Sequence, residues 1–352
     1  MVGTRLAPDP ALIQALRGRW ERILPELAGQ AWPAAWAPAL RGLSDRFNRL
    51  EGAPKGDYFG AENLAPYLAH HGWAQAASLA AIAAETPGIF TAATEVWDLG
   101  AGPGPLSLAA SLLAPGARFV LTDLRSEALA FAHRALQQAG VEARVERLRL
   151  PELPEGRPGL VLLGHTLNEL EPKEQERLLA RLKERLAPEG AIVILEPALM
   201  GPTRRLMELR ELFLAAPWSI PAPCPCPGPC PMLALPKQWC VAELPWAPPP
   251  WFSALDRAAG LERRHLAFAY LVVRRDAPDP TPRARIVGVP KAQKGKVERW
   301  VCTPAGGERW EALSRHGEPP WARPRMEEMP LPLQNEGLKE LEGGWKLRRW
   351  HP

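Results

Sequence analysis

The sequence predicts an α/β protein whose centre is a doubly wound parallel sheet, with helices before it and a small antiparallel β segment after it. Three observations predict this class. From Glu95 onward, short β-branched runs alternate with amphipathic segments of helix length. A glycine-rich turn directly follows the first of these runs. Before Glu95, apolar residues recur at spacings of three and four, which is typical of helices.

Length and composition agree with a globular protein of more than one domain. The chain has 352 residues, which is too long for one ordinary core, and 46% of them are hydrophobic and 23% charged. The first residues lack the apolar core of a secretory signal, and no segment approaches the run of about 18 apolar residues that a membrane helix needs. We therefore expect a cytoplasmic protein that makes no membrane contact.

The elements can be justified in chain order. Residues 11–24 and 62–85 have helical periodicity and predict a helical N-terminal domain over residues 1–90. Residues 126–140 and 172–190 predict crossover helices, the second with Pro172 near its first turn and Gly190 at its end. The strands of the central sheet are predicted at 95–99, 118–123, 143–148, 159–164 and 191–196.

The most specific local motif is the loop that begins at Asp98 and contains Gly100, Gly102 and Gly104. Glycines are needed where the chain turns sharply and a ligand must approach the backbone closely. A dinucleotide-binding fingerprint would need a third glycine at position 105, where this chain has proline. The loop instead resembles motif I of the class I methyltransferases, which cradles S-adenosylmethionine. Asp123 ends the second strand about twenty residues later, where a carboxylate can accept hydrogen bonds from both ribose hydroxyls.

The acceptor side of this site is less specific. Amino methyltransferases usually have Asn or Asp, two prolines and an aromatic residue after the fourth strand, and cytosine-C5 enzymes have a cysteine there. This chain has neither motif between Gly164 and Leu170. His165, Asn168 and Glu169 are the candidates to orient a substrate or act as a base, but Asn168 and Glu169 could equally cap the following helix.

The five cysteines all lie in the second half of the chain. An odd number in a cytoplasmic chain argues against a disulfide framework and favours metal ligation. Three lie within residues 223–231, each followed by proline, so this segment is predicted as a stiff loop. Zinc sites usually offer C-x-x-C pairs and iron–sulfur ligands often carry an adjacent proline, and the spacing leaves both metals open. Unligated thiols are the remaining alternative. The cysteines are Cys224, Cys226, Cys230, Cys240 and Cys302.

The last part of the chain predicts one more helix, over 251–260, and a closing strand of the sheet, over 265–275. Between Arg257 and Arg299 there are eleven Lys and Arg against four Asp and Glu, which fits either a solvated face or a surface that contacts RNA. A small antiparallel meander is predicted from three short strands at 283–289, 296–302 and 308–313.

Together, the glycine loop, the turn at residues 167–170 and the cysteines resemble a family of methyltransferase-like assembly factors of the mitochondrial and bacterial small ribosomal subunit. The resemblance covers most of the chain, from residues 61–72 to residues 301–307. Members of this family hold a four-iron (4Fe–4S) cluster. Cys226 stands at the family's histidine position and is the spare thiol. The ligands that the resemblance implies are Cys224, Cys230, Cys240 and Cys302.

This resemblance also implies the domain organisation. After the helical domain, a Rossmann-like class I methyltransferase domain that binds S-adenosylmethionine is expected over residues 91–275, with a Cys/Pro-rich metal loop at 216–250. A small antiparallel β extension is expected over 276–352. A cluster that joined Cys302 to the other three ligands would staple this extension to the metal loop.

Two functions from different classes follow. The resemblance implies an assembly or translation factor of the small ribosomal subunit that docks on rRNA, with cofactor and cluster stabilising its shape. The alternative is a catalytically active S-adenosylmethionine-dependent rRNA methyltransferase, and the missing acceptor motif counts against it. Radical S-adenosylmethionine chemistry would need a C-x3-C-x2-C spacing that these cysteines lack. No contact with DNA is expected.

Overall fold

The computed structural model divides into two compact units. The parallel-sheet unit comprises Pro8–Leu195 and Trp246–Arg264, and the antiparallel-sheet unit comprises Glu196–Pro245 and His265–Pro352. The residues that the structure describes are 8–28, 34–48, 60–215, 218–245, 247–261, 263, 265–275, 283–293, 296–313, 328–330, 339–341 and 345–350.

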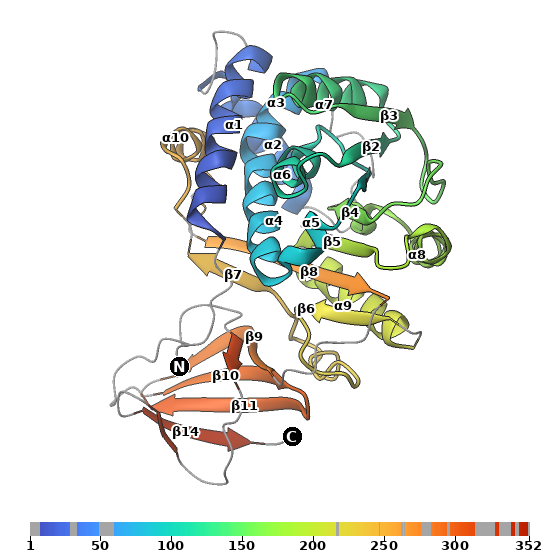
Figure 1. The fold of residues 1–352 in the computed structure, drawn as a ribbon. Coiled ribbons are helices and arrows are strands. Elements are labelled where there is room, and N and C mark those ends of the chain that lie inside the picture. Colours follow the sequence, from blue (N-terminus) through green and yellow to red (C-terminus); the bar gives the residue numbers. More distant parts are fainter. Residues whose placement is uncertain are drawn as a thin grey trace. The chain divides into compact units, whose positions relative to one another are not determined.

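The parallel-sheet unit is built on five parallel strands in the order β3-β2-β1-β4-β5 (Figure 1). They are β1 (Glu95–Leu99), β2 (Arg118–Asp123), β3 (Ala143–Arg147), β4 (Leu160–Gly164) and β5 (Ala191–Pro197). The order reverses between β1 and β4, and in such sheets ligands bind at the carboxyl ends of the strands on either side of this point. The predicted doubly wound sheet is confirmed.

Helices cover this sheet, and α1, α4 and α6 pack against one another (Figure 1). The helices are α1 (Pro10–Ala28), α2 (Ala37–Asn48), α3 (Ala61–Tyr67), α4 (Trp73–Glu85), α5 (Pro87–Thr91), α6 (Pro105–Leu113), α7 (Ser126–Gln138), α8 (Pro172–Arg185) and α10 (Pro250–Ala259). Two short 3-10 turns, η2 (Ala34–Trp36) and η4 (Leu167–Glu169), and a π-helical turn, η3 (Leu68–Gly72), join them. The predicted helical N-terminal part is confirmed.

The end of one predicted helix and the packing of the core can be traced to particular residues. Helix α8 ends at Arg185, before the predicted Gly190, because Pro188 disfavours helical backbone at the residue before it. Helix α4 is buried on nearly every face, so the early helices form part of the main core. Trp20, Trp73 and Trp97 are fully buried there.

The antiparallel-sheet unit contains α9 (Met200–Leu214) and two groups of antiparallel strands (Figure 1). In the first group, β6 (Ser219–Ala222) and β7 (Ala242–Pro245) both pair with β8 (His265–Arg274). The second is a six-stranded sheet in the order β12-β9-β10-β11-β14-β13. Its strands are β9 (Arg283–Gln293), β10 (Lys296–Thr303), β11 (Gly306–Leu313), β12 (Glu328–Pro330), β13 (Lys339–Leu341) and β14 (Trp345–Trp350).

The predicted antiparallel C-terminal part is therefore confirmed, and it is larger than expected. Helix α9 and strands β12, β13 and β14 were not predicted from the sequence. The division into three domains at residues 90 and 275 stays a prediction, and the two compact units follow other boundaries. Among the described residues, no helix combines the length and the apolar character needed to cross a membrane.

Candidate cofactor loop and thiol pocket

The glycine loop lies between β1 and α6. Gly100, Gly102 and Gly104 all have positive φ angles, of 71°, 53° and 79°. A Cβ on Gly100 would lie 2.6 Å from the Thr166 side chain, and a Cβ on Gly104 would lie 3.0 Å from that of Ala132. Side chains are therefore excluded at these two positions both by backbone conformation and by space.

Two carboxylates hold this loop in place. Asp98 is buried, and its Oδ2 accepts hydrogen bonds from the Ser107 backbone N–H at 3.1 Å and from the Ser107 hydroxyl at 2.6 Å. Burial raises the pKa of Asp98 to about 6. Asp123 Oδ2 accepts from the Gly102 N–H at 2.9 Å, and its Oδ1 accepts from the Arg125 N–H at 2.9 Å. The structure thus brings the predicted loop residues and Asp123 together at the carboxyl ends of β1 and β2.

His165 follows β4 and lies beside this loop. It is the one residue other than glycine with a positive φ, 57°, in the described part of the chain. Its Nδ1 is 3.3 Å from Gln75 Nε2, and burial lowers its pKa to about 4, so the imidazole is neutral at pH 7. The next residue, Thr166, donates its hydroxyl to the Leu99 carbonyl at 3.0 Å. This bond joins the end of β1 to the loop after β4.

Asn168 and Glu169 lie in the short turn η4. The alternative in which they cap the next helix is wrong, because Glu171 is the N-cap of α8 and forms a capping box with Glu174. Whether they contact a substrate stays a prediction.

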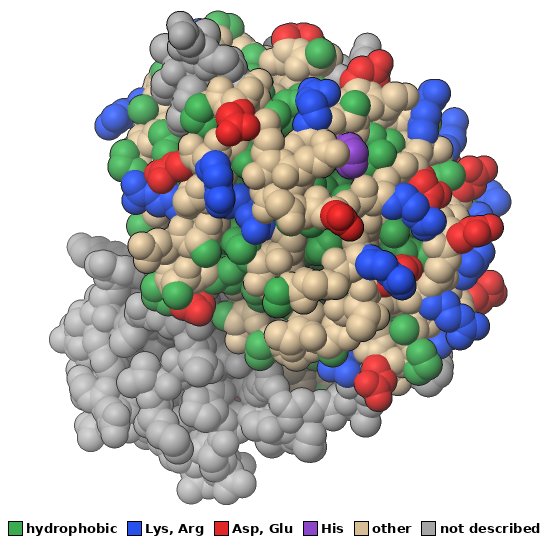
Figure 2. Space-filling model, turned by 45° about the horizontal axis from the view of Figure 1, so that its top comes forward, with side chains coloured by type: hydrophobic (Ala, Val, Ile, Leu, Met, Phe, Trp, Pro, Cys, Tyr) green, Lys and Arg blue, Asp and Glu red, His purple; other side chains and the backbone are tan. Residues whose placement is uncertain are grey.

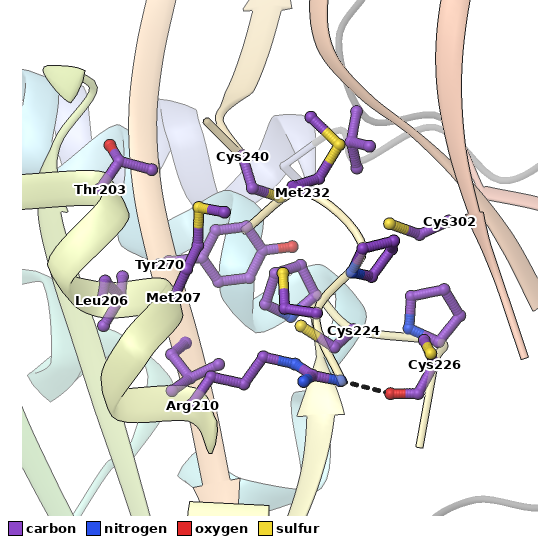
Figure 3. Close-up of a pocket in the computed structure, with 16 residues that line it drawn as sticks. Thr203, Leu206, Met207, Arg210, Cys224, Cys226, Met232, Cys240, Tyr270 and Cys302 are labelled. Atoms are coloured by element: carbon purple, nitrogen blue, oxygen red, sulfur yellow. Dashed lines mark hydrogen bonds between the residues drawn. The ribbon is translucent and has the colours of Figure 1, made fainter. Parts of the chain in front are cut away.

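All five cysteines line one pocket in the antiparallel-sheet unit (Figure 3). The loop between β6 and β7 supplies four of them, and β10 supplies Cys302. The pocket encloses about 530 Å³, counting the solvent at its mouth. Met207 of α9 and Met232 of the loop are buried against Cys302 in the same cluster. Every cysteine is a free thiol.

The thiols influence one another electrostatically. Burial, and then the neighbouring Cys240 and Cys224, raise the pKa of Cys302 well above its ordinary value. Burial, and then Cys224 and Cys230, do the same for the pKa of Cys240. Of the neighbouring cysteines, Cys226 contributes least to the raised pKa of Cys302. Its Sγ lies 3.9 Å from the Pro229 carbonyl oxygen. Four thiolates this close would repel one another unless a cation lay between them.

Two arginines of α9 fix the backbone of the cysteine loop. The buried Arg210 donates to the carbonyls of Cys226 and Gly228, and Figure 3 shows the first of these bonds. Although burial acts in the opposite direction, the Cys224 thiolate raises the pKa of Arg210 above its usual range. Arg204 donates to three carbonyls further along the loop, those of Leu233, Leu235 and Gln238, at 3.1, 2.9 and 2.8 Å.

The sheet side of the pocket is also specific. In the register, Cys302 of β10 pairs with Arg285 of β9 and with Gly307 of β11. Arg285 is buried and donates to the Tyr270 hydroxyl at 2.8 Å. A Cβ on Gly307 would lie 2.6 Å from Pro231 Cβ, so only glycine lets the cysteine loop lie against this strand.

Sequence reasoning missed Arg204, Arg210, Arg285 and Gly307. The arginines bind mainly carbonyl oxygens, which leave no pattern in a sequence, and only the Gly-Gly pair at 306–307 was a usable signal. Among the described residues, no three His, Cys, Asp or Glu side chains are placed to hold a metal ion. The ligand set Cys224, Cys230, Cys240 and Cys302 therefore stays a prediction.

Comparisons with known proteins identify the family. The family model described as mitochondrial small ribosomal subunit Rsm22 matches residues 67–321. No curated protein matches the chain.

Three of the similar solved structures are methyltransferases of low similarity. Ribosomal protein L11 methylase from Lactobacillus delbrueckii subsp. bulgaricus is 15% identical, with a TM-score of 0.34, 55% of this chain covered and 77% of that chain. Precorrin-6y C5,15-methyltransferase from Geobacter metallireducens GS-15 is 16% identical, with a TM-score of 0.37 and coverages of 55% and 89%. An RNA methyltransferase from Salinibacter ruber is 25% identical, with a TM-score of 0.25 and coverages of 29% and 64%. The family match spans well over half of the sequence, and the chain therefore belongs to the Rsm22 family.

Proposed function

We propose that this protein is an assembly or translation factor of the small ribosomal subunit. It binds S-adenosylmethionine at the glycine loop, holds a four-iron cluster in the thiol pocket and docks on rRNA. The observation that carries this proposal is the convergence of all five cysteines, from two separate segments, on one pocket in a chain of the Rsm22 family.

The donor set of the pocket fits an iron–sulfur cluster. In a cubane cluster each thiolate binds a different iron, so its ligands stand further apart than the four sulfurs around one zinc ion. The thiols influence one another's pKa and line one pocket together. Arg210 and Arg285 offset the negative charge of a cluster bound by four thiolates. When bound, the cluster would supply iron–sulfur bonds that join the cysteine loop to β10.

The glycine loop has the features that S-adenosylmethionine binding requires. Gly100 and Gly104 keep Cβ atoms away from the carboxyl end of β1, where a ligand can approach the backbone. Asp123 is proposed to bind the ribose hydroxyls. Because it already accepts a hydrogen bond from the Gly102 N–H, the ribose site and the loop are ordered together before the cofactor arrives.

The rRNA contact is proposed for the basic segment between Arg257 and Arg299, part of which lies outside the described residues. Binding to a polyanion requires clustered positive charge. The face drawn in Figure 2 does not offer it, because basic and acidic side chains are mixed there. The predicted cytoplasmic location stays a prediction, since the family description names a mitochondrial subunit.

The experiment that tests the proposal is the iron and sulfide content of protein purified without oxygen. We expect about four irons and four sulfides per chain. Cys302→Ser should lose most of this iron and lower the thermal midpoint, because metal binding and folding are coupled in such sites. Cys226→Ser is the matched control and should retain the iron. Zinc without sulfide, or equal iron in both variants, would contradict the proposal.

A catalytic rRNA methyltransferase is the second candidate, and the neutral His165 beside the glycine loop is the observation that favours it. A neutral imidazole whose Nδ1 accepts from Gln75 can orient a substrate through its Nε2–H. Methyl transfer from labelled cofactor to small-subunit RNA decides between the candidates, with Gly102→Asp as the variant that cannot bind cofactor. Label on the RNA that disappears in the variant would favour the enzyme. Subunit binding without any transferred label would favour the assembly factor.

A further inference from the structure

A chain of polar contacts runs from the loop after β4 into the first helices of the parallel-sheet unit. His165 Nδ1 lies 3.3 Å from Gln75 Nε2, and Gln75 Nε2 also donates to the Tyr67 hydroxyl at 2.7 Å. The Tyr67 ring lies against the His71 ring, with 5.3 Å between centroids. Tyr67, His71 and Gln75 belong to α3, η3 and α4, which follow one another along the chain, with the π-helical turn η3 in the middle. Such turns are frequent at functional sites.

The chain of contacts continues to the segment after α10. His70 lies next to His71, with 4.9 Å between ring centroids, and its Nε2 is 2.8 Å from Asp256 Oδ1. The other carboxylate oxygen, Oδ2, accepts the backbone N–H of Arg263 at 2.7 Å. Burial lowers the pKa of His70, His71 and His165, and the charge of Arg263 acts on all three imidazoles in the same direction. His165 and Arg263, the two ends of this series of contacts, are therefore near enough to interact electrostatically.

Several polar groups of this cluster lack a partner. His70 Nδ1 and His71 Nε2 are buried without a hydrogen bond. The Arg263 guanidinium has neither a hydrogen bond nor an ion pair within the described residues, since Asp256 bonds its backbone N–H instead. A guanidinium in this position is costly unless an anion meets it. Burial still lowers the pKa of Arg263 although Asp256 acts to raise it, so Asp256 offsets its charge only in part.

We infer that Arg263, with the imidazoles of His71 and His165, forms a subsite beside the glycine loop that binds the phosphate group of a nucleotide. A guanidinium matches phosphate oxygens with two parallel hydrogen bonds. The Nδ1 of His165 accepts a hydrogen bond from Gln75, so the ring proton lies on Nε2. This Nε2–H can donate to the phosphate. His165 and Arg263 are partly exposed, so a small ligand can reach them in the folded protein, whereas the Nε2 of His71 is buried.

A phosphate is favoured over the carboxylate of the cofactor by where the two sites lie. The cofactor is proposed to bind between Gly100 and Asp123, at the ends of β1 and β2. In the subsite, His165 follows β4, His71 lies in η3 and Arg263 follows α10. The inference rests on the proposed RNA contact for the source of the phosphate. It places one nucleotide where the cofactor faces the acceptor side.

The test is calorimetric titration of the full-length protein with uridine 5′-monophosphate, and with uridine as the probe that lacks phosphate. The nucleotide should bind at least about tenfold more tightly than the nucleoside. Arg263→Gln should remove this difference, and Arg134→Gln, which removes an exposed arginine of α7 outside the proposed rRNA contact, should keep it. S-adenosylmethionine affinity and iron content are measured in parallel. They should be unchanged in Arg263→Gln, so failure of the subsite can be told apart from failure of the proposed function.

Three results would overturn the inference. Equal binding of nucleotide and nucleoside would show that no phosphate is recognised. Weaker cofactor binding in Arg263→Gln, with nucleotide binding intact, would assign the arginine to the cofactor's carboxylate. If Arg263→Gln does not fold, the wild-type protein still decides, because inorganic phosphate should compete with the nucleotide. Absence of that competition would count against the subsite.

Discussion

The glycine loop and the thiol pocket are built in opposite ways. The loop is one continuous segment, from Asp98 to Ser107, and its shape is fixed by positive φ angles and by hydrogen bonds to two nearby carboxylates. The pocket is assembled from a helix, a long loop and three strands between Thr203 and Cys302. It brings together thiols that would repel one another once ionised.

This difference separates two kinds of site. A loop that its own backbone holds is complete before a ligand arrives, so a change there acts locally through space and strain. A pocket whose donors repel one another is completed by the cation that it binds, so a change anywhere around it alters both metal content and stability. Substitutions at matched positions can test whether the two regions behave in this way.

The largest effect is expected at Gly307, where the sheet meets the cysteine loop. Gly307→Ala places a Cβ 2.6 Å from Pro231, which cannot move without displacing Cys230. The contact alone should lower the free energy of unfolding by about 3 kcal/mol, and loss of the proposed cluster should add to this. The matched control is Gly228→Ala in the same loop, whose Cβ would meet only Cys226 Sγ at 3.9 Å. Denaturant unfolding and iron content are measured for both, and equal effects would contradict the proposed packing.

The next effect concerns the burial of Asp98. Its pKa is about 6 in the folded protein and near 3.8 when unfolded, so the folded state holds the extra proton between these values. Stability should therefore fall as pH rises from about 4 to about 6, by up to about 3 kcal/mol. Asp98→Asn should remove this slope. The control variant Asp45→Asn, at an exposed position, should leave it unchanged. Parallel curves of unfolding free energy against pH for all three proteins would exclude Asp98 as its source.

A smaller effect separates strain from crowding in the glycine loop. Gly104 and Gly116 have similar φ angles, 79° and 83°, but a Cβ at Gly104 would lie 3.0 Å from Ala132 and one at Gly116 would contact nothing. Gly116→Ala should cost about 1 kcal/mol from backbone strain alone. Gly104→Ala should cost about 2 kcal/mol because crowding is added. Thermal unfolding measures both, and equal costs would mean that α7 moves aside freely.

The same contrast explains what the sequence could predict. Strands β1, β2 and β4 and the glycine loop depend on local patterns, such as β-branched runs and glycines at fixed spacing, and these were found correctly. Helix α9 was missed. Arg210 was missed with it, because the hydrogen-bond partners of this side chain are carbonyls of a loop more than fifteen residues away. The cysteines were recognised as a group, but neither their spacing nor their residue type told zinc from iron. His165 was noticed, whereas Arg263 was not, because only folding brings α10 to the π-helical turn.

The smallest effect tests whether the cysteine loop is partly ordered before metal binds. Arg204→Met removes three hydrogen bonds to loop carbonyls, whereas Arg205→Met, one residue along α9, removes an ion pair with Glu208 at the surface. We expect Arg204→Met to cost about 1 kcal/mol more, because carbonyls lose charged donors. Limited proteolysis of metal-free protein should cut residues 233–238 faster in this variant alone. If both variants are cut at the wild-type rate, the metal and not α9 orders the loop, and the pocket would then differ from the glycine loop even more than proposed.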